Sequence, residues 1–510
     1  MKNLPMQTQA RITVPDACGL VMAESSIKDS GWGVFTLIPR KKGDRVHDGD
    51  PVIQIPDFNP LYAAGAKRLL WEYLWDGQET GGQYEGRHVM SMIPGIGMLA
   101  NGEANLHNAL PYKPQFDDGG LIRNVSPGAG AITHYHNFTW YSQKDLARGE
   151  EIFLNYGPGW FQERGYDDQP PPTETRTIPW LRENGYCVDN LVPGRSTIDH
   201  AGRGAFAVRD LEAGTIVAPV PVLPISSQSL EMRKEHESGR IVISEQLLRN
   251  YCFGHKNSSL LLFPYSPLVN LINHHSRPNL RLQWSMKSAQ HFGKPIEALQ
   301  DSSVQLLLEL VAIRPIQKGE ELTMDYGKDW VEAWRNHMAS WQPATERYLP
   351  SQILDDIIRI PRTEAEQREH PYPDNAFTSC FYKYSNRHEE HAVRQQGVQK
   401  PMTIFQWKWT KGIYEMRNLR PCSVLSRDHN AEKGKTLYTV RILNRPGLEK
   451  GEQIPKGLPH IVTHVPRTAI QFSDKLYTTN QHLEHAFRKE IGLDDDIFPS
   501  TWMDLVRVVE

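Results

Sequence analysis

The sequence predicts a β-rich α+β fold, with two tandem copies of one fold built from small β-sheets and a C-terminal α+β module. Three observations support this prediction. Short apolar runs punctuated by glycine and proline fill most of the chain, which is typical of small sheets. Two motifs recur at a nearly constant separation, which indicates an internal duplication. At 510 residues the chain is too long for one ordinary core, so several domains are expected.

The duplication is inferred from two pairs of matching motifs. Residues 31–36 read GWGVFT, and residues 202–207 read GRGAFA, 171 residues later. Residues 149–157 read GEEIFLNYG, and residues 319–327 read GEELTMDYG, 170 residues later. Two matches at opposite ends of a unit, with separations that differ by one residue, predict two copies of one domain.

The matches also set the expected domain boundaries. Three consecutive prolines at 170–172 favour an extended linker between the copies, because proline is excluded from helix interiors. The expected division is an N-terminal tail at 1–12, a first copy at 13–165, a proline-rich linker at 166–186, a second copy at 187–345, a polar and partly helical connector at 346–400, and a C-terminal α+β module at 401–510.

Composition and charge exclude several functional classes. The net charge of −3 argues against a dedicated nucleic-acid binder, which would need a strongly basic face. The N-terminus lacks the apolar core of a signal peptide, and no apolar run is long enough to span a membrane. We therefore expect a soluble intracellular protein, in the nucleus or the cytoplasm, with no membrane and no direct nucleic-acid binding.

The cysteines and histidines give no sign of a metal site. Five cysteines are scattered along the chain without a C-x-x-C pair, which excludes the usual zinc knuckles and gives no disulfide framework. This spacing favours a reducing compartment. His274 and His275 are adjacent, but no cysteine or carboxylate stands at ligand spacing, so no metal is expected.

Three motifs of the second copy follow one another in a recognisable order. GRG at 202–204, NHHSRPN at 273–279 and GEELTMDYG at 319–327 together resemble the ordered signature of the SET-domain lysine methyltransferases. The middle motif departs from the usual Asn-His-Ser-Cys-x-Pro-Asn, because His275 stands for the serine and Ser276 for the cysteine.

The resemblance implies transfer of a methyl group from S-adenosylmethionine to a lysine of a protein substrate, histone or non-histone. It implies that Tyr326 lines the lysine channel and orients the amine at the point of transfer. The cofactor would be contacted by Gly202, Arg203, Gly204, Asn273 and His274. Each role has a plainer alternative. Tyr326 could be an ordinary buried tyrosine, and Gly202 and Gly204 could form a turn between strands. Asn273 and His274 could be a pair that anchors a loop.

The implied chemistry requires a neutral lysine amine. Since lysine in water has a pKa near 10.4, holding it neutral at pH 7 costs about 4.6 kcal/mol unless the site lowers that pKa. A narrow apolar channel and the positive sulfonium of the cofactor both lower it. No strong base is then required, and Tyr326 would act by positioning and by its dipole.

Other aromatic residues are candidates for the channel wall. Tyr251 and Tyr265 lie upstream of the middle motif, and Tyr265 could equally belong to the core. The cysteine-rich zinc segment that often closes the lysine channel in this family is absent. In its place Trp330, Trp334, His337 and Trp341 fall on one face of a predicted helix. That face either packs on the core of its own domain or forms part of the channel wall.

The first copy keeps part of the pattern. Its corresponding residues are Gly31, Gly33, Asn101 and Tyr156, but Gly102 stands where the second copy has its histidine. An active site in this copy and a degenerate copy that packs on its partner both remain open. Further helices are expected at 61–75, 244–251 and 480–491, and strands at 437–443 and 460–465.

Two other functions compete with catalysis. A non-catalytic pair of SET-like domains could serve as a protein-interaction scaffold, which the altered middle motif favours. A chromatin or peptide reader could be built on residues 401–510, where no catalytic motif is found.

Overall fold

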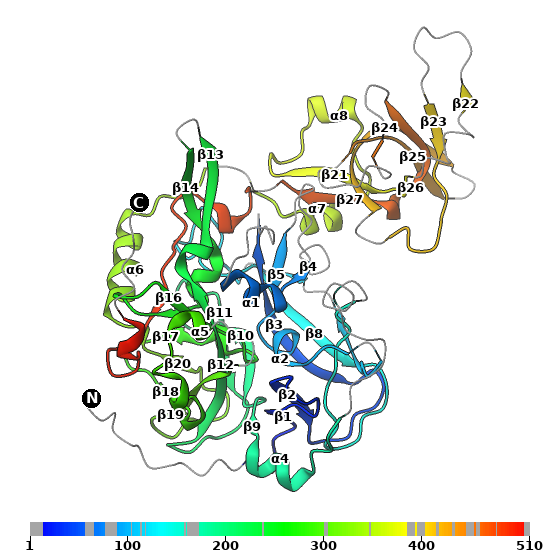
Figure 1. The fold of residues 1–510 in the computed structure, drawn as a ribbon. Helices are drawn as coiled ribbons and strands as arrows, with labels where there is room; N and C mark the ends of the chain where they lie inside the picture. Colours follow the sequence, from blue (N-terminus) through cyan, green and yellow to red (C-terminus); the bar gives the residue numbers. More distant parts are fainter. Residues whose placement is uncertain are drawn as a thin grey trace.

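The computed structural model places a large body beside a smaller lobe (Figure 1). The lobe consists mainly of the strands β21 to β27, and the large body holds the strands before them together with the C-terminal segment. The structure describes residues 14–56, 66–76, 89–103, 105–112, 115–117, 119–157, 160, 173–236, 239–299, 304–345, 348–384, 393–394, 403–414, 418–430, 434–444, 453–454, 459–475 and 477–503.

The central region, residues 187–345, is built on a six-stranded sheet in the order β18-β19-β12-β16-β15-β28. Its long strand β12 is buried along nearly all its length, because β16 and β19 pair with it in antiparallel register. The strands are β12 (Ile216–Ser226), β15 (Phe253–Gly254), β16 (Leu260–Pro264), β18 (Leu280–Trp284), β19 (Leu306–Ala312) and β28 (Ile491–Gly492).

Three two-stranded sheets complete this region. The pairs are β10 (Leu191–Arg195) with β11 (Arg203–Ala207), β13 (Glu231–His236) with β14 (Gly239–Glu245), and β17 (Asn273–His274) with β20 (Thr323–Met324). The last pair is parallel, with Asn273 opposite Thr323. It brings the NHHSRPN and GEELTMDYG motifs side by side.

The N-terminal region, residues 14–165, contributes to two sheets, one of which also includes the later strand β9. One has the order β4-β5-β3-β8-β6, with β7 also paired to β8, and the other has the order β2-β1-β9. The strands are β1 (Leu20–Glu24), β2 (Trp32–Thr36), β3 (Arg45–Ile55), β4 (Trp75–Asp76), β5 (Met90–Met92), β6 (Ala109–Tyr112), β7 (Gln115–Phe116), β8 (Tyr135–Ser142) and β9 (Tyr186–Cys187). One apolar core joins residues of this region to the central region, for example Trp140 with Phe263.

The lobe is a seven-stranded sheet in the order β22-β23-β26-β25-β24-β21-β27. Its strands are β21 (Ala376–Phe381), β22 (Val393–Arg394), β23 (Thr403–Gln406), β24 (Leu419–Asn430), β25 (Lys435–Ile442), β26 (His460–Pro466) and β27 (Ile470–Asp474). The two strands expected at 437–443 and 460–465 are confirmed as β25 and β26. Strand β21 lies within the stretch expected to be a connector.

The helices are short, apart from one of 13 residues, α6. They are α1 (Ala66–Glu72), α2 (Ile96–Leu99), α4 (Ile178–Asn184), α5 (Ile296–Leu299), α6 (Lys328–Ser340), α7 (Ser351–Ile357) and α8 (Glu364–Glu369). The tryptophan spacing correctly predicted α6. Of the helix expected at 61–75, residues 66–72 form α1 and residues 61–65 lie outside the described part of the chain. At 244–251 only a 3-10 helix forms, η3 (Leu247–Tyr251).

The expected helix at 480–491 is wrong. A 3-10 turn covers Asn480–His482, and the chain then runs extended to β28, with the left-handed residue His485 in between. The apolar residues that suggested a helix serve tertiary packing instead. Ile491 pairs with Phe253, and Ile491, Leu493, Phe498 and Trp502 enter the core of the central region. Tertiary contacts override a local periodicity of this kind.

The expectation of no disulfide framework is also wrong. Cys18 is bonded to Cys187 and Cys380 to Cys422, while Cys252 is free and buried. The partners are 169 and 42 residues apart in sequence, so local spacing could not reveal them. Only the fold brings the Cα atoms of each pair within bonding reach.

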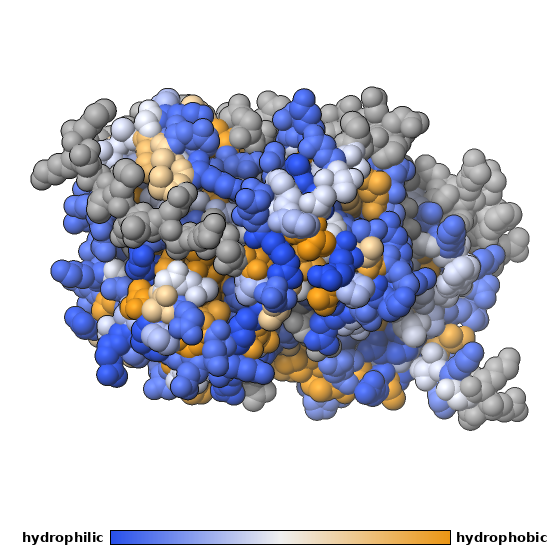
Figure 2. Space-filling model, turned by 90° about the horizontal axis from the view of Figure 1, so that it is seen from below, coloured by the Kyte–Doolittle hydropathy of each residue, from blue (hydrophilic) through white to orange (hydrophobic). Residues whose placement is uncertain are grey.

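The surface is mostly hydrophilic on the face seen in Figure 2, with apolar residues in patches between hydrophilic ones. No helix in the described part of the chain is long and apolar enough to cross a membrane.

Candidate functional site

A pocket with a cavity volume of about 150 Å³ lies where the motifs of the central region meet. Several parts of the chain line it: the loop before β11, residues 250–253, residues 264–274 with the start of the middle motif, residues 324–326, the start of α6, and residues from outside the central region. The lining residues are Ala131, Ile132, Ile198, Asp199, His200, Ala201, Asn250, Tyr251, Phe253, Pro264, Val269, Asn270, Ile272, Asn273, His274, Met324, Tyr326, Trp330, Trp334, Phe487 and Ile491.

Tyr326 lies in this pocket at the end of β20. Its hydroxyl donates a hydrogen bond to the Ile272 carbonyl oxygen at 2.5 Å, and its backbone N–H donates to His274 Nδ1 at 3.1 Å. Burial raises the pKa of Tyr326 above its usual value. The hydroxyl therefore stays protonated, so it can orient a ligand but cannot serve as a base at neutral pH.

Asn273 and His274 share the same short strand but have different surroundings. Asn273 Nδ2 lies 2.8 Å from the Arg203 carbonyl oxygen and 3.3 Å from Glu321 Oε1. Its amide thus ties the middle motif to the glycine motif. The His274 ring lies 5.7 Å from the Tyr326 ring and 5.5 Å from the Trp330 ring, and burial lowers its pKa. We expect a neutral imidazole.

The glycine motif packs against both the N-terminal region and the central region. Gly202 has a φ of +72°, and a Cβ on it would lie 2.5 Å from Ile132 Cδ1. A Cβ on Gly204 would lie 2.5 Å from Glu321 Oε1. Both positions therefore need glycine for packing within the chain, whatever they do for a ligand. Arg203 between them forms an ion pair with Asp117 of the N-terminal region.

The three predicted channel residues have different positions. Tyr251 lines the pocket, and its hydroxyl accepts a hydrogen bond from Thr133 N at 2.8 Å. Trp330 also lines it. Tyr265 is not among the described residues that line the pocket. Its ring lies 5.5 Å from that of Tyr73, buried between the N-terminal and central regions.

Helix α6 closes one side of the pocket with its aromatic face. Trp330 and Trp334 stack at 5.8 Å, and the Phe487 ring lies 5.5 Å from the first and 5.0 Å from the second. His337 Nε2 lies 2.8 Å from the Pro127 carbonyl oxygen, so the helix also contacts the N-terminal region. Trp341 follows the last residue of the helix.

Sequence reasoning missed several residues of the pocket. Asn250 donates to the carbonyl oxygens of Ala131 at 2.8 Å and Phe487 at 2.9 Å, so one amide joins two walls. Asn270 also lines the pocket, and its Oδ1 is buried without a hydrogen-bond partner. Ala131 and Phe487 carry no signal in the sequence, because long-range folding alone brings them here.

The N-terminal region repeats much of this geometry. Tyr156 donates its hydroxyl to the Ala100 carbonyl oxygen at 2.7 Å, as Tyr326 does to Ile272. A Cβ on Gly33 would lie 2.2 Å from Glu151 Oε1, and one on Gly31 would lie 2.9 Å from Gln305 Nε2.

The histidine position is where the repeated geometry changes. A Cβ on Gly102 would lie 2.3 Å from the Tyr156 ring, so the ring rests directly on the glycine backbone. Asn101 Nδ2 lies 3.0 Å from the Trp32 carbonyl oxygen.

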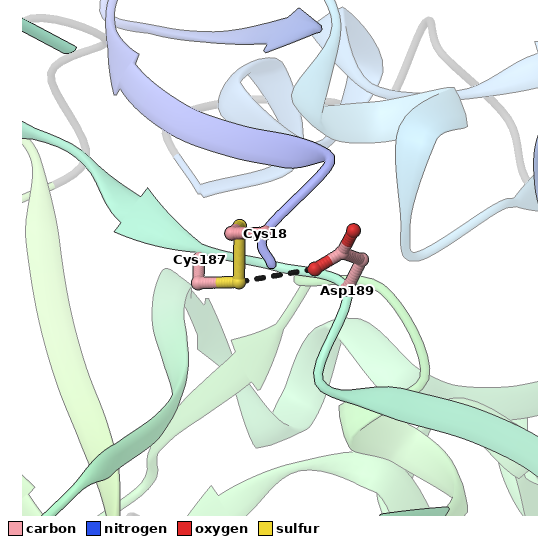
Figure 3. Close-up of side chains that lie close together, drawn as sticks. All are labelled: Cys18, Cys187 and Asp189. Carbon is pink, nitrogen blue, oxygen red and sulfur yellow. Dashed lines mark hydrogen bonds between the residues drawn. A yellow bond between two sulfur atoms is a disulfide. The ribbon is translucent and has the colours of Figure 1, made fainter. Parts of the chain in front are cut away.

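One cluster elsewhere resembles a metal-ligand set. Cys18, Cys187 and Asp189 lie close together, with the two sulfurs joined and Cys187 Sγ 3.0 Å from Asp189 Oδ1 (Figure 3). The sulfur and oxygen atoms that could bind a metal ion already have other partners. Arg209 lies 3.1 Å from Asp189 Oδ1, and Gly19 N donates to Asp189 Oδ2 at 2.7 Å. A guanidinium beside a disulfide does not suit a cation.

Comparison with known proteins identifies one domain. Residues 202–327 match the family model of the SET domain. Similar solved structures include a Plasmodium falciparum putative histone methyltransferase, with 20% identity, 28% of this chain and 96% of that chain covered, and a TM-score of 0.18. For an active polycomb repressive complex 2 in the stimulated state, the identity is 18%, the coverage 31% and 17%, and the TM-score 0.20.

A third similar structure is KRYPTONITE in complex with mCHH DNA, an H3(1-15) peptide and SAH, with 21% identity, coverage of 27% and 23%, and a TM-score of 0.19. No curated protein sequence matches the chain. These structural similarities are weak, and the assignment depends on the match of residues 202–327. The chain carries a SET domain there, a domain typical of S-adenosylmethionine-dependent protein-lysine methyltransferases.

Proposed function

We propose that the chain transfers a methyl group from S-adenosylmethionine to a lysine side chain of a protein, histone or non-histone. The observation that carries the proposal is Tyr326, whose protonated hydroxyl lies in an aromatic pocket lined by residues of the second and third motifs and by Ile198 to Ala201, which directly precede the glycine motif. Tyr326 is the proposed catalytic residue.

The residues present fit the cofactor. A cavity of about 150 Å³ holds one ring-sized group of the cofactor. Aromatic faces at Trp330 and Tyr326 suit a sulfonium cation. When bound, the cofactor supplies an activated methyl group. The residues proposed to hold it are Gly202, Arg203, Gly204, Asn273 and His274.

The chain's own residues prepare the acceptor. The apolar and aromatic walls at Tyr251, Ile272 and Trp330 exclude water, which lowers the pKa of a lysine amine and favours its neutral form. The Tyr326 hydroxyl donates its hydrogen bond to the Ile272 carbonyl oxygen, so its lone pairs are free to accept a hydrogen bond from an N–H of the amine. That contact fixes the direction of the nitrogen lone pair.

Tandem SET-like copies at about 13–165 and 187–345 are part of this proposal. The shared hydrogen-bond geometry of Tyr156 and Tyr326 supports it. We propose that the first copy is degenerate, since the Tyr156 ring lies on Gly102 where the second copy has His274. The first copy then serves as a wall of the second copy's pocket, through Ala131 and Ile132. The lobe has a packing or docking role.

Calorimetric titration of S-adenosylmethionine tests the proposal. We expect the wild type to bind, Asn273→Ala to bind at least about tenfold more weakly through loss of its contacts to Arg203 and Glu321, and Asn101→Ala to bind like the wild type. Equal losses of affinity in Asn273→Ala and Asn101→Ala would show that the cofactor binds elsewhere or that both copies contribute to its site.

One observation favours the competing scaffold function. The space beside Gly202 is filled by Ile132 and Leu121, which lie where a ligand approaching the glycine would pass. If the chain is a scaffold that binds no cofactor, calorimetric titration with millimolar S-adenosylmethionine should give no heat of binding.

A further inference from the structure

Helix α6 forms one wall of the pocket without a buried residue of its own. The structure describes all 13 of its residues, and the two that line the pocket, Trp330 and Trp334, are only half-buried. A helix gains most of its stability from the face that it buries, so the position of α6 depends on the contacts of these few half-buried rings. The wall therefore needs a support outside the helix.

The Phe487 ring contacts α6 at three points. Its centroid lies 5.5 Å from that of Trp330, 5.0 Å from that of Trp334 and 5.4 Å from that of His337. All three contacts are edge-to-face, an arrangement that aromatic pairs favour. The Phe487 side chain is buried, with 6% of the residue exposed. It thus packs on the aromatic face of α6 along about two helical turns.

Phe487 is fixed by the central region and not by α6. Its carbonyl oxygen accepts a hydrogen bond from Asn250 Nδ2 at 2.9 Å, and Lys489 N donates to Asn250 Oδ1 at 2.9 Å. Two residues further along the chain, Ile491 pairs with Phe253 of the central sheet. The backbone on which the Phe487 ring stands is therefore anchored, and α6 packs against a fixed partner.

Trp330 connects this support to Tyr326. The Trp330 ring lies 4.9 Å from the Tyr326 ring at an interplanar angle of 88°, and 5.5 Å from the His274 ring. We propose that Phe487 is a positioning residue of the reaction, which holds α6 so that Trp330 stays against Tyr326 and keeps water out of the pocket. The inference rests on the proposed function, since it gives Phe487 a part in that same site.

A loosened α6 would change the ionisation of the acceptor lysine. A dry pocket favours the neutral amine, because burial disfavours the charged form. Without the Phe487 ring, water would enter beside Trp330, and the pKa of the bound lysine would rise toward its value in water, about 10.4. The pH dependence of kcat reports ionisations of the enzyme–substrate complex, so it detects this rise.

Two substitutions in the same C-terminal segment form a matched pair. Phe487→Leu removes the ring and keeps an apolar side chain. Phe498→Leu makes the same change at a residue that is 1% exposed and packs on His255 and Trp502. Phe498 is not among the described residues that line the pocket. Both variants keep the titratable side chains of the pocket lining and of the α6 face, which are Asp199, His200, Tyr251, His274, Tyr326 and His337.

Each variant is measured in the full chain by transfer of labelled methyl groups from S-adenosylmethionine to unfractionated histones, between about pH 6 and 10. We expect the pKa in the kcat profile to rise by about one unit in Phe487→Leu, so that kcat falls about tenfold below that pKa and recovers at high pH. Phe498→Leu should keep the wild-type profile, even where it lowers the midpoint of thermal unfolding. Hydrogen exchange of the α6 amides should be faster in Phe487→Leu alone.

Other results overturn the inference. The same shift of the kcat profile in Phe498→Leu would show a general effect of stability. A higher KM with an unchanged kcat profile would show that Phe487 binds a ligand directly and does not act through Trp330. Should Phe487→Leu not fold, Phe487→Met takes its place with the same expectation. A wild type that transfers no methyl group refutes the proposed function itself, whereas an active wild type with an unchanged kcat profile and α6 exchange in Phe487→Leu refutes only the role of Phe487.

Discussion

Glu321 and Glu151 occupy matching positions in two separate networks. Glu321 accepts hydrogen bonds from Ser196 Oγ at 2.6 Å and Thr197 N at 2.8 Å. Glu151 accepts from Ser25 Oγ at 2.8 Å and from the next backbone N–H, that of Ser26, at 2.7 Å. Each carboxylate also approaches the asparagine of its own region, Asn273 or Asn101, at 3.3 Å. In both regions a glutamate holds the loop that precedes the glycine motif.

This relationship predicts different outcomes for the same substitution. Glu321→Gln and Glu151→Gln each replace an oxygen that accepts hydrogen bonds with an amide NH2 group. This group then faces the serine hydroxyl and backbone N–H donors without accepting from them, so each substitution should lower the free energy of unfolding by about 2 kcal/mol. Only Glu321→Gln should also weaken S-adenosylmethionine binding, because the Ile198 to Ala201 loop it supports lines the pocket. Denaturant unfolding and calorimetry measure the two effects. Cofactor affinity that falls in Glu151→Gln as well would contradict the asymmetry.

Two buried histidines make stability dependent on pH. Burial lowers the pKa of His134 to about 3 and of His136 to about 4, and neither ring nitrogen of His134 has a hydrogen-bond partner. Because the folded pKa lies below the unfolded value of 6.5, their neutral forms contribute full stability above pH 6.5. That stability is lost progressively as the pH falls from 6.5 toward 3.

Unfolding in urea at pH 7 and pH 5 checks this dependence. Each histidine should reduce the free energy of unfolding at pH 5 by about 2 kcal/mol relative to pH 7. His134→Leu removes one of the two buried rings, so its acid-induced loss should be about 2 kcal/mol smaller than that of the wild type. An identical pH profile in wild type and variant would show that His134 is not buried in this way.

Arg488 joins three parts of the chain around the pocket wall. Its guanidinium donates to the carbonyl oxygens of Gly130 at 2.7 Å and Glu245 at 3.0 Å, and also to that of Gln481. Burial lowers its pKa to about 10, so it stays charged at neutral pH. Arg488→Met would leave these oxygens unpaired and should lower the free energy of unfolding by about 3 to 5 kcal/mol.

Arg335 provides the control for that substitution. It lies exposed on α6, so Arg335→Met should change the midpoint of urea unfolding very little. If both methionine variants unfold at the wild-type midpoint, the bonds of Arg488 do not hold the wall together.

The disulfides predict a definite thiol count. With Cys18 bonded to Cys187 and Cys380 to Cys422, the denatured, non-reduced chain should expose one reactive thiol, that of Cys252. Reducing the bond between Cys18 and Cys187 should destabilise the chain by about 5 kcal/mol, since it closes a loop of 169 residues. Thiol titration in denaturant gives the count, and five reactive thiols would contradict both bonds.

The motifs predicted the part of the pocket that local sequence builds. Asn273, His274 and Tyr326 come together because their strands β17 and β20 pair in parallel, and each motif places its residues at a strand end. The tryptophan spacing also predicted α6, whose aromatic face carries its own periodicity.

The rest of the pocket could not be predicted, because it depends on contacts between distant segments. Ile132 and Phe487 reach the cavity from regions more than 60 residues away from the nearest SET motif. Phe487 was expected on a helix, but the extended C-terminal segment is fixed by pairing of Ile491 with Phe253. Asn270 stands only three residues before Asn273, yet nothing in the sequence shows that its Oδ1 lacks a partner.

The most direct test of the central claim compares the two matching tyrosines. Tyr326→Phe and Tyr156→Phe each remove a hydroxyl that donates to a carbonyl oxygen, at 2.5 and 2.7 Å. The measurement is the kcat of methyl transfer from labelled S-adenosylmethionine to unfractionated histones. We expect Tyr326→Phe to lower kcat by about 100-fold with unchanged cofactor affinity, and Tyr156→Phe to keep the wild-type rate. Full activity in Tyr326→Phe, or an equal loss in both variants, would contradict it.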